Sequence, residues 1–413
     1  MIFSSLEFLC VFLPVVFALY CLLPSIKVKN ALLIVASLLF YAYGEPVYVL
    51  LMIASSFMNY GMARLIAKGE KGKKIFLVLA VALNLGMLAV FKYADFAVDT
   101  VNGLLSTNIP LPGITLPIGI SFFTFQALSY VIDVYWERVE VQKNYFNILL
   151  YISFFPQLIA GPIVKYRDIN EAIENRVMNA DEIAKGLRRF ICGLGKKVLI
   201  ANTAGLVADH VFTAAHSKVN FVVAWIGAIA YLMQIYYDFS GYSDMAIGLG
   251  HMFGFHFKEN FQYPYGADSI QEFWRRWHIT LGTWLKDYIF YPVSLAKPVK
   301  KIAKKVKGTF GLSVSKFVAP SIALFFVWLG NGIWHGAGWT YLFYGMYYFV
   351  LIFIENITEE SRQKWAQKHN VDYHKFGWRI LTFVKLFIII NLGEMFFRAP
   401  TLTDGFGMLA KIC

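Results

Sequence analysis

Two histidines of this sequence lie in stretches rich in tryptophan. His335 lies in GNGIWHGAGW, residues 330–339, and His278 ends FWRRWH, residues 273–278. An imidazole in an apolar run is costly unless a partner or a hydrated cavity faces it. A neutral histidine is also the usual general base near pH 7. We therefore predict that His335 takes the proton from a hydroxyl while the hydroxyl oxygen attacks an acyl carbonyl.

The neighbours of His335 suit this role. Asn331 comes four residues earlier, so a helix would place it on the same face, where it can fix the tautomer of the ring. The stretch also contains four glycines: Gly330, Gly332, Gly336 and Gly338. They serve close helix packing or leave room for a substrate, and both interpretations are open. Trp334 and Trp339 either wall the site or anchor at the membrane interface, with anchoring favoured.

His278 lies in the segment ADSIQEFWRRWHITLGTWLKDYIFYP, residues 267–292. Ser269 and Glu272 have the spacing of a capping box, which predicts a helix that begins near Ile270. One face of this helix would then carry Ile270, Phe273, Trp274, Trp277, His278 and Leu281. Arg275 and Arg276 project from another face, as in a helix that lies in the plane of the membrane interface. A lone histidine on an apolar face is more often a hydrogen-bonded core residue than a functional one.

The composition identifies the kind of protein that must position these residues. Of 413 residues, 58% are hydrophobic and 15% are charged, against about 25% charged in soluble domains. The apolar runs predict an all-α, polytopic membrane protein with about nine to eleven membrane helices in a single domain, residues 1–413.

The net charge of +12 does not indicate nucleic-acid binding, because basic patches interleaved with aromatic residues are absent. The lysines gather in what we expect to be two short cytoplasmic loops, with membrane lipids as neighbours. The loops hold Lys68, Lys71, Lys73 and Lys74, and Lys297, Lys300, Lys301, Lys304, Lys305 and Lys307. The charge pattern also places the N-terminus outside and the stretch around Asp99 outside.

Two segments are expected to interrupt the helices. FFPQLIAGPIVKY, residues 154–166, has charged stretches on both sides that should be cytoplasmic, so we predict a re-entrant segment beside a cavity, with Gln157 as a substrate-binding candidate. YYDFSGYSDMAIGLG, residues 236–250, is the second interruption. Its Asp238 and Asp244 are functional candidates because carboxylates in membrane segments are costly. A polar turn that caps the next helix explains them equally well.

Several kinds of chemistry are not indicated. The HExxH, GxxxxGK[ST] and GxSxG patterns are absent, and no activated serine or cysteine accompanies the histidines. Direct transfer between two bound substrates is thus simpler than an acyl-enzyme, with an acyl-histidine still open. His251 and His256 are too weak a pair to predict a metal site. We predict no metal and no tightly bound cofactor.

Six stretches, in order along the chain, resemble the membrane-bound O-acyltransferase (MBOAT) family, in particular its bacterial alginate-O-acetylation branch. They are MIFSSLEFLCVFLPVVFALY at the N-terminus, FFPQLIAGPI at 154–163, YYDFSGYSDMAIGLG at 236–250, ENFQYPY at 259–265, SIQEFWRRWHITLGTWLKDYIFYP at 269–292 and GIWHGAGWTYLFYG at 332–345. The resemblance implies that His335 is the principal catalytic histidine and His278 a second one, at a funnel or tunnel where donor and acceptor meet.

The resemblance also implies a function and partners. Members of this branch lie in the bacterial plasma membrane and pass acetyl groups toward extracytoplasmic polysaccharides such as alginate, cellulose or peptidoglycan. They act with a separate extracytoplasmic acetyltransferase. Acetyl-CoA or a thioester on a cytoplasmic carrier protein would be the donor; related D-alanyl transferases use a carrier protein. Arg275 and Arg276 would pair with donor phosphates or lipid headgroups, and Asp238 and Asp244 would line the acceptor side. Relatives commonly continue past the FFRA motif, whereas this sequence ends at Cys413.

Two functions of other classes stay open. Helices broken at Pro156–Pro162 and at Gly241 resemble the discontinuous helices of transporters and flippases, although no paired, similarly interrupted halves are found. A non-catalytic membrane scaffold that docks a secreted transferase is the other alternative.

Overall fold

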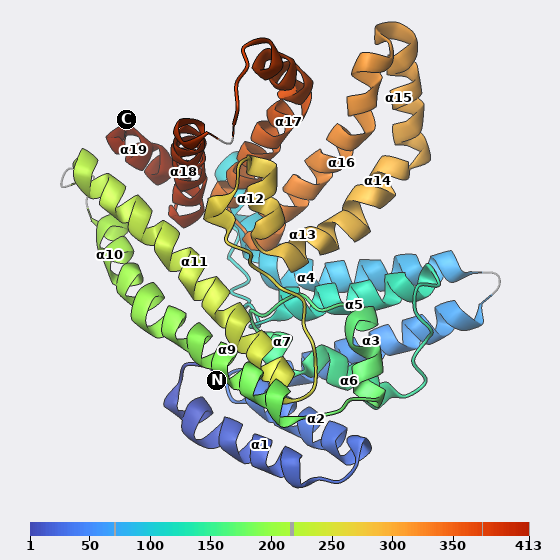
Figure 1. Ribbon diagram of the computed structural model, residues 1–413. Helices are drawn as coiled ribbons and strands as arrows, with labels where there is room; N and C mark the ends of the chain where they lie inside the picture. Colours follow the sequence, from blue (N-terminus) through green and yellow to red (C-terminus); the bar gives the residue numbers. More distant parts are fainter. Residues whose placement is uncertain (70–71, 215–218, 374, 413) are drawn as a thin grey trace. The chain divides into compact units, whose positions relative to one another are not determined.

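The computed structural model describes residues 1–69, 72–214, 219–373 and 375–412. Within these ranges the chain is helical and has no β-strand, which confirms the all-α class (Figure 1). Lys71 of the first lysine cluster and the terminal Cys413 lie outside the described residues. Two compact units are found, Met1–Leu199 with Tyr237–Glu259, and Ile200–Tyr236 with Asn260–Cys413. A single domain for residues 1–413 stays a prediction.

Seven helices of the described chain are long and apolar enough to cross a membrane. They are Tyr48–Lys68, Lys73–Leu105, Ala180–Thr213, Phe221–Met252, Leu312–His335, Trp339–Lys368 and Phe376–Arg398. Two shorter apolar helices, Phe8–Leu22 and Ile120–Tyr135, are also found, so the long helices of the described residues are fewer than the nine to eleven expected. Helices suit a bilayer because they satisfy their backbone N–H and C=O groups internally. The polytopic membrane class is thus confirmed.

The first unit packs around phenylalanine rings. It holds η1 (Phe8–Phe12), α1 (Leu13–Leu22), α2 (Ile26–Ala42), α3 (Tyr48–Lys68), α4 (Lys73–Leu105), α5 (Ile120–Tyr135), α6 (Tyr145–Ser153), α7 (Phe155–Leu158), α8 (Tyr166–Glu174) and α9 (Ala180–Gly195). Phe40, Phe155 and Phe253 are fully buried, and the Phe155 ring centroid lies 5.6 Å from that of Phe40 and 5.7 Å from that of Phe253. The motif FFPQLIAGPI therefore supplies core residues to this unit.

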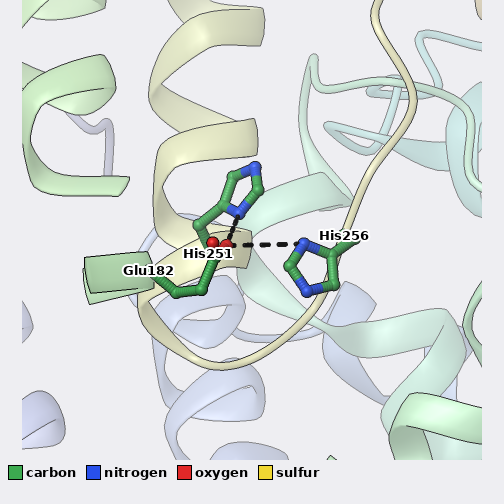
Figure 2. A group of neighbouring side chains, drawn as sticks. All are labelled: Glu182, His251 and His256. Atoms are coloured by element: carbon green, nitrogen blue, oxygen red, sulfur yellow. Dashed lines mark hydrogen bonds and ion pairs between the residues drawn. The ribbon is translucent and has the colours of Figure 1, made fainter. Parts of the chain in front are cut away.

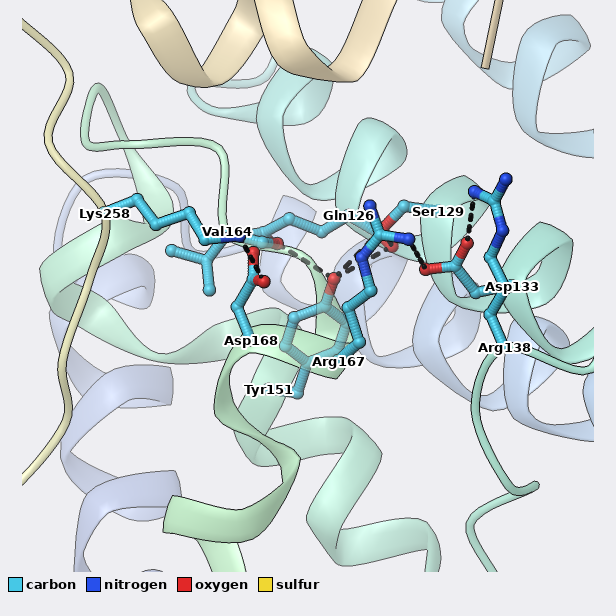
Figure 3. Close-up of polar contacts among 9 residues, drawn as sticks. All are labelled: Gln126, Ser129, Asp133, Arg138, Tyr151, Val164, Arg167, Asp168 and Lys258. Atoms are coloured by element: carbon cyan, nitrogen blue, oxygen red, sulfur yellow. Dashed lines mark hydrogen bonds and ion pairs between the residues drawn. The ribbon is translucent and has the colours of Figure 1, made fainter. Parts of the chain in front are cut away.

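The predicted break in FFPQLIAGPIVKY is confirmed. α6 has 9 residues, α7 has 4, and residues 159–165 are not helical, whereas a membrane crossing needs about 20 helical residues. The Tyr151 hydroxyl fixes the segment, because it lies 3.1 Å from the Gln126 carbonyl oxygen and 3.0 Å from that of Val164 (Figure 3). Gln157 donates a hydrogen bond to the Tyr151 carbonyl. That the segment is re-entrant stays a prediction.

A buried carboxylate joins α5 to the start of α8. The Asp133 side chain is fully buried and faces Arg138 at 3.7 Å and Arg167 at 3.8 Å (Figure 3). In the same view, the Asp168 carboxylate accepts a hydrogen bond of 2.6 Å from Lys258. A buried carboxylate is tolerated when cations compensate its charge. These pairs explain why the charged stretch after the broken segment packs against the unit.

The predicted interruption at YYDFSGYSDMAIGLG is wrong. α11 (Phe221–Met252), which contributes to both units, continues through Gly241 without a break. Its glycines permit close packing on α9. A Cβ on Gly241 would lie 2.7 Å from the Gly193 carbonyl oxygen, and a Cβ on Gly248 would lie 2.5 Å from that of Gly186. The glycines are therefore needed for the approach of two helix backbones and not for a turn.

The second unit contains the two histidine motifs. Its helices are α10 (Asn202–Thr213), η4 (Pro264–Gly266), α12 (Ile270–Arg276), α13 (Ile279–Leu285), η5 (Lys286–Phe290), α14 (Tyr291–Leu295), α15 (Lys297–Phe310), α16 (Leu312–His335), α17 (Trp339–Lys368), α18 (Phe376–Arg398) and α19 (Leu402–Ile412), with η2 (Lys196–Ala201) at its boundary. The lysines from Lys297 to Lys307 lie on α15, so the expected loop is wrong there. Pro298 stands in the first turn of this helix, where a missing N–H is harmless.

Candidate active site

The FWRRWH segment forms two helices rather than one. α12 begins at Ile270 as predicted, with the Ser269 hydroxyl accepting a hydrogen bond of 3.0 Å from the Glu272 backbone N–H. It ends at Arg276, and α13 begins at Ile279, so the helix predicted to continue through His278 is wrong. His278 between them has φ +42°, a left-handed conformation that costs a non-glycine residue about 1–3 kcal/mol. Such a backbone is maintained only where its surroundings fix it.

Asn260 provides those surroundings. Its backbone oxygen accepts a hydrogen bond of 2.9 Å from the Ile279 N–H, and its side-chain oxygen accepts one of 3.2 Å from the Thr280 N–H. Both N–H groups belong to the first turn of α13, where no intrahelical acceptor is available. Asn260 therefore caps α13 from outside the helix and directs the chain away from α12.

The same side chain determines the protonation of His278. The Asn260 Oδ1 atom lies 3.0 Å from His278 Nδ1. It must be an oxygen, because the Thr280 backbone N–H that faces it can only donate. The neutral His278 ring therefore carries its proton on Nδ1, and Nε2 is its acceptor nitrogen. The residue is 3% exposed, and burial lowers its pKa well below the ordinary value, with a further contribution from His335.

His335 is the last residue of α16 and is half-buried among aromatic rings. Its ring centroid lies 4.9 Å from that of Trp334, 5.0 Å from Phe397 and 5.9 Å from Tyr344. Trp334 is buried, and its ring also lies 5.8 Å from that of His278. Because it is buried against both histidine rings, the favoured membrane anchor is wrong for this residue, and that it walls a substrate site stays a prediction. Trp339 is exposed, which agrees with an anchor.

A cavity of about 420 Å³ brings the two histidines together. Four helices of the second unit, α12, α13, α16 and α17, and the η5 turn contribute to its wall. Its lining includes five of the predicted residues: His278, His335, Asn331, Trp274 and Arg275. Small-molecule sites are commonly of this size, largely apolar and with few polar groups.

Among the described residues, the side chains that line the cavity include buried polar atoms without a hydrogen-bond partner. Asn331 Oδ1 and Trp274 Nε1 have no hydrogen-bond partner among the described residues. One is an acceptor and the other a donor. Buried polar groups are nearly always satisfied in proteins, so an orphaned pair at a cavity is typical of a ligand site. Asn331 does not bond to the His335 ring here, and its effect on the tautomer stays a prediction.

The remaining candidates have protein partners. Arg276 pairs with Glu272 and donates a hydrogen bond of 3.3 Å to the Gly266 carbonyl, so it holds the α12 region together. Asp244, in the first unit, accepts hydrogen bonds of 3.0 Å from Arg189 and 2.6 Å from Lys196. Asp238 pairs with Lys197, and Gln157 is fully buried beside Tyr151. Substrate binding by these four stays a prediction.

Comparison with known proteins identifies the chain. The family model described as MBOAT, membrane-bound O-acyltransferase family, matches residues 137–396. The chain belongs to this family. It is 37% identical over 409 residues to "Probable alginate O-acetylase AlgI" of Pseudomonas syringae pv. tomato, covering 97% of this chain and 73% of that protein. It is 34% identical to "Peptidoglycan O-acetyltransferase" of Helicobacter pylori, with 99% and 79% covered, and 28% identical to "Teichoic acid D-alanyltransferase" of Bacillus subtilis, with 61% of each covered.

Membership makes the protein an acyltransferase and, with the seven long apolar helices of its described residues, a multi-pass bacterial membrane protein. At two glycines of this acyltransferase's GNGIWHGAGW motif, neighbouring atoms pack so closely that a side chain would not fit. A Cβ on Gly332 would lie 2.5 Å from the Tyr341 carbonyl oxygen, and one on Gly336 would collide with the Tyr341 ring. Of the two interpretations of the glycines, packing is thus confirmed at both positions.

Three further residues of the acyltransferase site region were missed from sequence. Asn260 lies in the ENFQYPY motif but has no spacing that relates it to His278. Lys286 also lines the cavity, where it adds a second positive charge to that of Arg275. Glu394 is a buried carboxylate on α18 that accepts a hydrogen bond of 3.0 Å from the Tyr344 hydroxyl, and Tyr344 packs against His335. Its signal was a carboxylate within an apolar run, NLGEMFF.

Proposed function

We propose that the protein transfers an acetyl group from a thioester to a hydroxyl of an extracytoplasmic polysaccharide, directly or through a secreted partner transferase. The observation that carries this proposal is that His278, between α12 and α13, and His335, at the end of α16, line one cavity. Two relatives named for O-acetylation of alginate and of peptidoglycan support acetyl as the group and a polymer as its destination. The donor is acetyl-CoA or a thioester on a carrier protein.

His335 acts as the general base in this proposal. It takes the proton from the attacking hydroxyl while the hydroxyl oxygen forms a bond to the acyl carbon. The carbon–sulfur bond of the resulting tetrahedral intermediate then breaks, and the imidazolium gives its proton to the departing sulfur. The products are an ester and a thiol, and the histidine returns to its neutral form.

The other lining residues suit binding and charge stabilisation. The Trp274 Nε1–H, which is buried without a partner among the described residues, would donate a hydrogen bond to the carbonyl oxygen as it gains negative charge. His278 Nε2 and Asn331 Oδ1 are acceptors that would orient N–H or O–H groups of the donor or the acceptor sugar. Arg275 and Lys286 would pair with donor phosphates or with lipid headgroups. Arg275 suits this role better than Arg276, which is paired with Glu272.

Replacing His335 tests the proposal. Polymer should be isolated from cells with the wild-type protein and with His335→Ala, and its ester-linked acetate measured by release and mass spectrometry. We expect the variant to lose about 100-fold or more of the acetylation rate, the usual contribution of a general base. His210→Ala is the matched control, because His210 is an exposed histidine on α10. Equal amounts of membrane-inserted protein must be shown for all three chains.

The alternatives give different results in the same experiment. Acetylation at the wild-type level in His335→Ala would contradict catalysis at this cavity and favour a scaffold. Loss of acetylation with continued export of unmodified polymer would contradict a transporter. D-alanyl esters in place of acetyl esters on the polymer would contradict acetyl as the group transferred. The unbroken α11 already removes one of the two broken helices on which the transporter alternative rested.

A further inference from the structure

A second cluster of histidines lies in the first unit. Glu182, in the first turn of α9, faces two histidines near the end of α11, His251 and His256 (Figure 2). The Glu182 carboxylate oxygen Oε2 lies 2.9 Å from His251 Nδ1 and 3.9 Å from His256 Nδ1. The three potential ligand atoms lie within 4.8 Å of one another. Neither histidine lines the cavity of His278 and His335.

We propose that Glu182, His251 and His256 bind a divalent transition-metal ion, with Zn²⁺ as the ion that fits best. Two imidazole nitrogens and one carboxylate oxygen form a ligand set typical of zinc, and three protein ligands leave the fourth tetrahedral position for water. Ligand bonds of about 2.0–2.2 Å around a tetrahedral ion place the ligand atoms about 3.3–3.6 Å apart. The two distances from Glu182 Oε2 lie on either side of this range, and the three ligand atoms lie within 4.8 Å of one another, so the side chains would have to rotate toward a common point to bind an ion.

The backbone that carries the histidines is fixed in advance. In the sequence HMFGFH, Phe253 and Phe255 are fully buried, while the two histidines reach the surface. The Phe255 N–H donates a hydrogen bond of 2.8 Å to the Gly250 carbonyl, and Gly254 has φ +82°, a conformation suited to glycine. This turn returns the chain beside the end of α11 and brings the His256 ring centroid to 4.8 Å from that of His251.

The backbone that carries Glu182 is fixed as well. A Cβ on Gly186 would lie 2.5 Å from the Gly248 carbonyl oxygen and 3.0 Å from the His251 Cβ, so α9 and α11 are in close contact one turn from Glu182. Asn179 caps α9 and bonds to the Glu182 N–H at 2.8 Å. Preorganised ligands of this kind lower the entropic cost of binding an ion. A bound ion would tie the first turn of α9 to the end of α11.

Lys185 competes with the ion for the carboxylate. Its ammonium group lies 2.8 Å from Glu182 Oε1, and 59% of its side chain is exposed. It can therefore turn into solvent when a metal binds. Its charge still opposes that of the ion, so removal of the charge should strengthen metal binding. A site in which Glu182 merely pairs with its neighbours would not show this effect.

Zn²⁺ titration of the full-length, tag-free protein in detergent tests the proposal, by calorimetry and by the rise of the unfolding temperature with Zn²⁺. We expect one ion per chain, binding weakened about 10-fold or more in His256→Ala and Glu182→Gln, and binding strengthened about 3-fold or more in Lys185→Gln. His210→Ala should bind Zn²⁺ with the affinity of the wild type.

The His256→Ala variant should still fold, because the His256 side chain is 62% exposed. Absence of stoichiometric Zn²⁺ binding by the folded wild type, or unchanged affinity in both ligand variants, would overturn the proposal.

Discussion

Asn260 decides which nitrogen of His278 carries the proton. Its side-chain oxygen accepts three hydrogen bonds: one of 3.0 Å from His278 Nδ1, one of 3.2 Å from the Thr280 N–H and one of 2.8 Å from the Thr280 hydroxyl. One amide thereby links the cap of a helix to the chemistry of a cavity. The left-handed backbone of His278 is the cost of placing the ring there, and it is found where a site needs a fixed side chain.

The pH dependence of the protein should reflect this arrangement. Burial lowers the pKa of His278 well below the ordinary value, and His335 lowers it further. Unfolded His278 binds a proton near its ordinary pKa of about 6.5, whereas the folded ring stays neutral to lower pH. Its contribution to stability is therefore present above about pH 6.5 and is lost as the pH falls below it.

Asn260→Asp should move the acid limb of activity to higher pH. A carboxylate beside Nδ1 raises the pKa of His278 by about one unit or more, so the neutral ring needed in the cavity is lost earlier on acidification. Transferase activity of purified protein from pH 5 to 8 measures the shift, and unfolding temperatures should show the variant less sensitive to acid. Asn175→Asp, at an exposed position, is the control. An acid limb that stays in place would refute the proposed coupling.

At the level of elements, the close pairing of α16 and α17 holds His335 in position. Gly332, one turn before the histidine, touches the Tyr341 backbone, and Gly345 on α17 touches the Trp328 backbone. Backbone cannot move aside as a flexible side chain does. Close approach of helices through small residues is the usual packing in membranes, where the hydrophobic effect does not drive helices together.

Gly332→Ala should therefore destabilise the protein and reduce its activity. The added Cβ would lie 2.5 Å from the Tyr341 carbonyl oxygen, and overpacking of this kind costs about 1–3 kcal/mol. Gly308→Ala on α15 is the matched control, since a Cβ there meets nothing within 4 Å and alanine favours a helix by about 0.5–1 kcal/mol. Unfolding temperatures in detergent should move in opposite directions. Equal shifts would contradict the packing role.

Periodicity and capping signals predicted part of these elements. The start of α12 at Ile270 followed from Ser269 and Glu272, because a cap is local in sequence. The break at His278 was not predictable, because the groups that cap α13 come from Asn260, 18 residues earlier. Gly241 was misread as a break because its packing partner Gly193 lies on another helix. Likewise, the proximity of Glu182 to His251 and His256, on which the proposed metal site rests, is not visible in the spacing of these residues.

At the level of the whole molecule, composition and charge gave the class of protein but not the assignment of residues to the site. Of the predicted binding residues, Asn331, Trp274 and Arg275 line the cavity, whereas Arg276 pairs with Glu272. Asp238, Asp244 and Gln157 have partners in the first unit. A carboxylate within an apolar segment has the same sequence signature whether it binds a substrate or pairs with a lysine or an arginine of the protein. Charge alone therefore could not separate the two roles.

The distribution of lysines along the chain predicts its orientation in the membrane. Lysines near membrane segments stay on the cytoplasmic side, so α15 and the end of α3 should both be cytoplasmic, and the end of α4 should be outside. In a background with all four cysteines replaced by serine, Lys68→Cys and Lys304→Cys should react with a membrane-impermeant maleimide only after spheroplasts are lysed. Ser106→Cys, just beyond α4, should react in intact spheroplasts. Labelling of Lys304→Cys before lysis would contradict the cytoplasmic position of α15.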